Sequence, residues 1–160
     1  MNTGNLKITT LGDREIAMTR VFNAPRQLVF DAYTKPELLK RWLGVFDGWS
    51  LAVCEIDLRA GGTYRYVWRK QGAPEMGMRG VYREVVPPER IVATEVYDQP
   101  WYEGEGVGTV SFIVQGRKTT LTITMRYASK DVRDAVLKSP MEQGLGASFD
   151  KLAELLASLP

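Results

Sequence analysis

The feature that most constrains the fold is a change of hydrophobic period in the middle of the chain. Between residues 50 and 127, apolar and polar residues alternate in short runs, which turn-forming stretches such as Gly61-Gly62 separate. Alternation with a period of two is typical of strands with one buried face, and short turns join antiparallel neighbours. The pattern therefore predicts an antiparallel meander of six strands over 50–58, 62–70, 76–86, 91–98, 108–115 and 119–127.

Other elements are expected on both sides of this meander. Residues 16–22 predict one more strand, and two short helices follow the break at Asn23-Ala24-Pro25. Thr34 and Ser139 each stand three residues before a glutamate, a spacing that predicts a capping box at the start of a helix. The last segment predicts a long helix with the apolar stripe Met141, Leu145, Ser148, Leu152, Leu155, Leu156 and Leu159.

This order of elements predicts an α+β fold in a single domain over residues 15–160. A seven-stranded antiparallel sheet with one apolar face must cover that face, and only the C-terminal helix is long enough to do so. We therefore expect a curved sheet wrapped around that helix. The polar residues 1–14 are expected to form a flexible N-terminal segment.

Composition excludes several classes of chemistry. The 160 residues include no histidine and one cysteine, Cys54, so histidine-dependent nucleophile systems, histidine or thiolate zinc sites and an internal disulfide are excluded, and only all-carboxylate metal binding stays possible. We expect no metal and no cofactor, and we assign no catalytic residue. The net charge of +2 is too small to imply a nucleic-acid partner. Without a long apolar run or a signal-peptide pattern, we expect a cytoplasmic protein that does not insert into membranes.

The alternation also separates the two faces of the sheet. Arginines such as Arg65, Arg69, Arg79 and Arg83 fall on the face opposite the aromatic residues. Surfaces that bind single-stranded nucleic acid need cations and aromatic rings together, so this separation argues against such a partner. We interpret the arginines as a solvated outer face, with an anionic partner as the alternative.

The inward face is rich in tyrosine, methionine and tryptophan, whereas a dry core favours leucine, isoleucine and valine. Buried tyrosine and tryptophan need partners for their polar tips, and Gly144 and Gly146 leave space in the covering helix. These features indicate an internal cavity for a small molecule, with a merely aromatic core as the alternative. The predicted lining consists of Trp42, Tyr64, Tyr66, Trp68, Met78, Tyr82, Glu95, Tyr97, Phe112, Met125, Met141 and Leu145.

Glu95 shares its alternation with Ile91, Ala93 and Tyr97, so its carboxyl group is expected inside. A carboxyl group there must be paired or have a raised pKa, as general acids and bases do. A satisfied structural acid and a one-residue error in register are the alternatives. The long connection over residues 99–107 has an aromatic tip and is a candidate lid, or else a wide hairpin.

Five segments carry a family resemblance: residues 22–30, 36–42, 57–62, 80–91 and 141–144. Together they resemble the activator of heat-shock-protein-90 ATPase homologue family, over nearly all of residues 15–157. The resemblance implies the helix-grip fold of the START and birch-pollen-allergen superfamily, also called SRPBCC. That superfamily includes lipid and sterol carriers, polyketide cyclases and the co-chaperone itself, so fold does not fix function.

Our leading hypothesis is binding of a small apolar, aromatic or lipid-like ligand between the sheet and the C-terminal helix, without covalent chemistry. One alternative is a cyclase or dehydratase that uses Glu95 as acid or base. Another is a co-chaperone-like module that binds a chaperone through its outer surface. A homodimer also stays possible.

Overall fold

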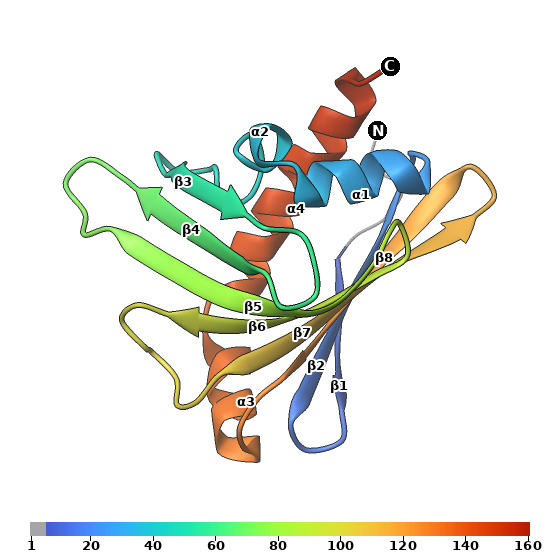
Figure 1. Ribbon diagram of the computed structural model, residues 1–160. Coiled ribbons are helices and arrows are strands. Elements are labelled where there is room, and N and C mark those ends of the chain that lie inside the picture. The colour runs from blue at the N-terminus through green and yellow to red at the C-terminus, as the bar shows by residue number, and fades with distance from the viewer. Residues whose placement is uncertain (1–5) are drawn as a thin grey trace.

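Antiparallel strands form one curved sheet in the computed structural model, which describes residues 6–160 (Figure 1). Within those residues the sheet has eight strands in the order β1-β2-β8-β7-β6-β5-β4-β3, so β2 lies between β1 and the last strand of the chain. Their bounds are β1 (Lys7–Leu11), β2 (Glu15–Phe22), β3 (Ser50–Ile56), β4 (Thr63–Arg69), β5 (Met76–Val86), β6 (Arg90–Tyr97), β7 (Gly106–Gln115) and β8 (Lys118–Arg126).

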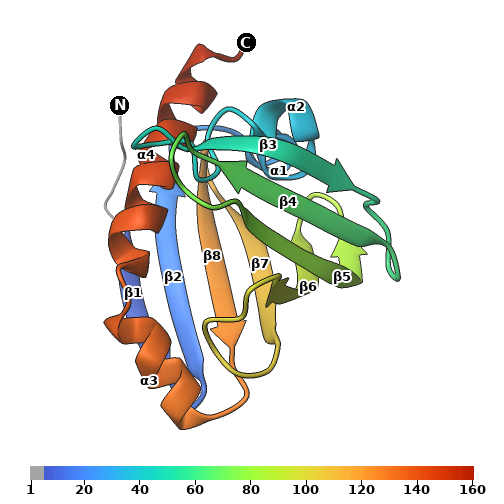
Figure 2. The same ribbon diagram turned by 90° about the vertical axis from the view of Figure 1, so that its left-hand side faces the viewer.

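Four helices accompany the sheet in the described part of the chain: α1 (Arg26–Thr34), α2 (Pro36–Leu39), α3 (Lys130–Lys138) and α4 (Met141–Ser158). Figure 2 shows α4 running along one side of the curved sheet, with α1 and α2 near one end of it. Helix α1 contacts β7, β8 and α4. The ring of Phe149 on α4 packs edge-on against Phe22 of β2, with ring centroids 5.7 Å apart, and lies 6.0 Å from Trp42. Aromatic packing therefore joins the sheet to α4 and to the segment that follows α2.

The α+β helix-grip architecture is confirmed, and the strands predicted from residue 16 onward begin and end within two residues of the observed ones. The number of strands was wrong, because Lys7–Leu11 forms β1, antiparallel to β2. The expectation of a flexible segment over residues 1–14 is therefore wrong for β1, and residues 1–5 lie outside the described part. Most residues of β1 are exposed, so this strand shows no apolar alternation in the sequence. As an edge strand, it is held by backbone hydrogen bonds to its one neighbour, β2.

Neither predicted capping box forms. The Thr34 hydroxyl donates to the carbonyl of Phe30 at 2.8 Å, and the Ser139 hydroxyl donates to the carbonyl of Val136 at 2.6 Å. Both hydroxyls thus satisfy the end of the preceding helix instead of capping the next one. Helices α2 and α4 have no side-chain cap.

The outer face of the sheet carries paired charges. Arg65 donates two hydrogen bonds to Asp98, at 2.7 and 2.5 Å, and Arg79 donates a third at 2.8 Å. The hydrogen bonds from Arg65 lower the pKa of Asp98. This pairing supports the interpretation of these arginines as a solvated face. Within residues 6–160, none of the helices has the length and apolar character needed to span a bilayer.

Candidate ligand cavity

A cavity of about 760 Å³ lies between the inner face of the sheet and the N-terminal half of α4. Strands β4, β5 and β6 contribute the largest share of the sheet side, with smaller parts from β7 and β8, and the segment from Leu43 to Trp49 also lines the cavity. The lining is mainly aromatic, methionine and aliphatic side chains. Of the predicted residues it includes Tyr64, Tyr66, Trp68, Met78, Tyr82, Glu95, Tyr97, Met125, Met141 and Leu145.

Trp42 and Phe112 do not line the cavity, and their placement there was wrong. Both are almost fully buried in the core. The Trp42 indole donates to the carbonyl of Ala32 at 2.9 Å, and the Phe112 ring packs edge-on against Phe30 at 5.2 Å. Tyr33 of α1 contacts both rings and lines the cavity instead. Tyr33 lies on the apolar face of its helix, which predicts that it is buried but does not predict that it lines the cavity.

Glycines on two strands create space for the larger side chains. Gly80 on β5 lies opposite Tyr64 on β4, and a Cβ atom at Gly80 would overlap the Tyr64 ring. Its absence lets the Tyr64 hydroxyl donate to the backbone carbonyl of Thr94 at 2.6 Å. On β7, Gly106 lies opposite Glu95, so no side chain crowds the carboxyl group from that strand.

Polar contacts hold the segment after α2 between strand β4 and the middle of α4. The Trp68 indole donates to the carbonyl of Leu43 at 3.0 Å, and the amide of Gly44 donates to the Ser148 hydroxyl at 2.9 Å. Gly44 has a φ of +69°, and a Cβ there would collide with the Trp68 ring. Only glycine therefore allows this close approach.

Glu95 points inward from β6, as the alternation predicts, and a tyrosine pairs with it. The Tyr102 hydroxyl donates to Oε2 of Glu95 at 2.7 Å. Burial raises the pKa of Glu95, and the hydrogen bond from Tyr102 partly opposes that shift. No lysine or arginine among residues 6–160 forms an ion pair with Glu95.

The phenols around Glu95 respond to its charge. Burial is the main cause that raises the pKa of each phenol, and repulsion from Glu95 raises it further. The affected side chains are Tyr33, Tyr64, Tyr97, Tyr102 and Tyr127. These residues are therefore neutral hydrogen-bonding groups at physiological pH.

Sequence reasoning missed the partnership of Tyr102. This residue lies in the long connection between β6 and β7, which joins antiparallel neighbours. Its ring packs at 5.0 Å from Trp101 and 5.3 Å from Tyr127. Trp101 is 47% exposed and lines the cavity. A connection without strand periodicity gave no signal for where the Tyr102 hydroxyl would lie.

The single cysteine and the acidic side chains of residues 6–160 are the candidates for a reactive thiol or a metal-binding group. Burial raises the pKa of Cys54 to about 11, so its thiol stays protonated and acts as a small hydrophobic group. Among residues 6–160 no three Cys, Asp or Glu side chains gather closely enough to hold a metal ion.

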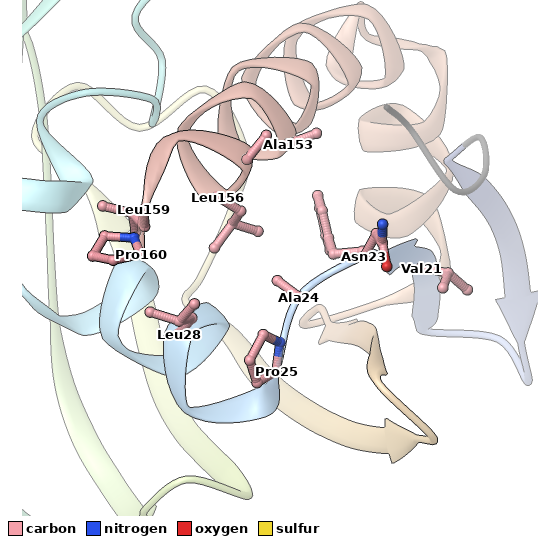
Figure 3. A pocket seen from close by; sticks show the side chains of 11 residues that line it. Val21, Asn23, Ala24, Pro25, Leu28, Ala153, Leu156, Leu159 and Pro160 are labelled. Atoms are coloured by element: carbon pink, nitrogen blue, oxygen red, sulfur yellow. The ribbon is translucent and has the colours of Figure 1, made fainter.

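A second hollow of about 440 Å³ lies between the start of α1 and the end of α4 (Figure 3). Pro25, Leu28, Leu156 and Leu159 are among the residues that line it. No Asp, Glu, Lys, Arg or Tyr side chain of the described residues 6–160 belongs to the lining. The larger cavity is therefore the better candidate site, because it combines apolar volume with groups that orient a ligand.

Comparisons with known proteins agree with this fold. The family model of the Activator of Hsp90 ATPase homolog 1-like protein matches residues 23–157. A solved protein from Rhodobacter sphaeroides is 28% identical, with a TM-score of 0.92 and coverage of 98% of this chain and 100% of that chain. One from Chromobacterium violaceum is 27% identical, with a TM-score of 0.75 and coverage of 89% and 96%. Comparison with curated proteins gave no match.

Proposed function

Because this chain belongs to the family of Activator of Hsp90 ATPase homolog 1-like proteins, as its sequence suggested, we propose that it binds a small, largely apolar ligand in the cavity under α4. The family assignment is compatible with ligand binding and with a co-chaperone-like role. The observation that favours ligand binding is the cavity of about 760 Å³, whose aromatic and methionine walls surround the inward carboxyl group of Glu95.

The dimensions and chemistry of the cavity suit a small molecule. Ligand pockets of about 300–1,000 Å³ with apolar walls and few polar groups are typical of small-molecule sites. Burying about 200 Å² of apolar ligand surface contributes about 5 kcal/mol, before the costs of association are subtracted. Apolar contact with the walls is therefore too weak by itself for micromolar binding, which needs additional polar contacts. Glu95 and Gln99 are lining residues that offer such contacts.

The proposal is tested with the neutral fluorophore N-phenyl-1-naphthylamine. We expect saturable fluorescence enhancement with one site per chain. Ala93→Trp places an indole inside the lining and should abolish the enhancement. Ile113→Trp is the matched control, because Ile113 is 48% exposed and does not line the cavity. Equal binding by the two variants, with both folded by circular dichroism, would contradict the proposal.

A specific observation favours acid–base catalysis as the second candidate function. Glu95 combines a raised pKa with a hydrogen bond from Tyr102, an arrangement that suits proton transfer to a bound carbonyl compound. In that case a ligand bound to the protein would be converted, and Glu95→Gln would stop the conversion while binding persists. Recovery of the ligand unchanged after long incubation, by mass spectrometry, would support the binding function alone.

A further inference from the structure

We propose that the ligand carries a protonated amine, which Glu95 and the aromatic rings beside it bind in preference to a neutral or anionic group. This inference rests on the proposed function and names the chemical class of the ligand. It follows from the charge of the lining, from the surroundings of Glu95 and from the rings near it.

Among residues 6–160, the lining contains acidic side chains but no basic ones. Its charged members there are Glu75 and Glu95, and none of the lysines or arginines described belongs to it. Glu75 is exposed and accepts a hydrogen bond from Arg69 at 2.5 Å, so its charge is already compensated. An anionic ligand such as a fatty acid would therefore meet a carboxylate without any cation to hold it. Such a ligand is disfavoured on electrostatic grounds.

Glu95 has an uncompensated charge when it is ionised. Its Oε2 accepts a hydrogen bond from Tyr102, and within the described residues its Oε1 accepts none. A largely desolvated carboxylate without a cationic partner is costly, and a cation bound beside it offsets part of that cost. An ammonium group on the ligand would supply the missing charge and donate to Oε1.

Aromatic rings close to Glu95 favour the same chemistry. Tyr97, Trp101 and Tyr127 line the cavity, and Tyr102 packs among them. The centroids of neighbouring rings lie 5.0–6.1 Å apart, so the rings form one continuous cluster. Such rings attract cations through their π-electron faces, and this attraction strengthens when the cation loses water. Carboxylate and rings together form a site for an apolar amine.

Three probes with one aromatic body and different head groups test the inference: 2-(2-naphthyl)ethylamine, 2-(2-naphthyl)ethanol and 2-naphthylacetate. Their affinities are measured by isothermal titration calorimetry at pH 7.5. We expect the amine to bind about tenfold more tightly than the alcohol, a difference of about 1.4 kcal/mol, and the carboxylate to bind most weakly. Glu95→Gln should remove most of the preference for the amine, because only the attraction of the rings for the cation then remains.

Glu105→Gln is the control, because it removes the same charge from an exposed carboxylate that pairs with Arg83 on the outer face. It should keep the preference for the amine. If the alcohol binds and the amine binds no more tightly, or if Glu95→Gln keeps the full preference for the amine, the inference is overturned while the binding function stands. If none of the three probes binds the wild-type protein, the proposed function fails and the inference fails with it.

Discussion

Two glycines in α4 provide a matched test of the space above the cavity. A Cβ atom at Gly146 would meet nothing within 4 Å, whereas one at Gly144 would lie 3.6 Å from Cζ of Phe46, an ordinary van der Waals contact. Alanine is favoured over glycine in a helix interior by about 1 kcal/mol. We therefore expect Gly146→Ala and Gly144→Ala each to raise the free energy of unfolding, by up to about 1 kcal/mol. In a chain of this size that gain raises Tm by about 2–4 °C.

Ligand binding separates the two positions. Gly144 lines the cavity and Gly146 does not. A larger side chain at Gly144 therefore occupies ligand space, whereas the same side chain at Gly146 does not. We expect Gly144→Leu to weaken binding of N-phenyl-1-naphthylamine by about tenfold or more, an effect of about 1.4 kcal/mol. Gly146→Leu should leave binding unchanged.

Calorimetric unfolding and the fluorescence titration measure both effects on the same protein samples. Loss of stability in Gly146→Ala would refute the claim that this helix position is open. Full affinity in folded Gly144→Leu would refute the claim that the cavity beside α4 is where the ligand binds.

Three further predictions follow from single side chains. Burial raises the pKa of Glu95 above its ordinary value of 4.5, so ionised Glu95 reduces stability as pH rises through that higher pKa. Glu95→Gln should therefore be more stable than wild type in urea at pH 7 and lose this advantage at pH 4; an advantage that persists at pH 4 would contradict the reasoning. Cys54, whose pKa is raised to about 11, should resist iodoacetamide at pH 8 in the native protein and react fully in guanidinium chloride; rapid native labelling would show an accessible thiolate. Tyr64→Phe leaves the Thr94 carbonyl without its 2.6 Å hydrogen bond, so it should reduce unfolding free energy by about 1–3 kcal/mol; an unchanged urea midpoint would show that water replaces the hydroxyl.

Alternation predicted the parts of the site that lie on regular strands. The inward position of Glu95 followed from its period-two relation to Ile91, Ala93 and Tyr97, and β6 is regular over that stretch. A regular strand fixes every second side chain on one face, so sequence alone carried this information.

Sequence could not locate features that depend on neighbouring elements. Alternation placed Phe112 on the correct face of the sheet, but α1 covers that part of the face, so Phe112 packs in the core. The partner of Glu95 came from a connection without periodicity. Thr34 and Ser139 matched a capping pattern, yet each hydroxyl had a second acceptor in the preceding helix. Local patterns do not decide between two local partners.

The most direct test of the binding function is methyl NMR of the protein labelled with ¹³C at its methionine methyl groups. Met18, Met78, Met125 and Met141 line the cavity from three strands and α4. Titration with 2-(2-naphthyl)ethylamine should shift all four methyl signals together and saturably, because the aromatic ring of the ligand lies among them. Saturable binding that leaves these four signals unchanged would place the ligand elsewhere and contradict the account.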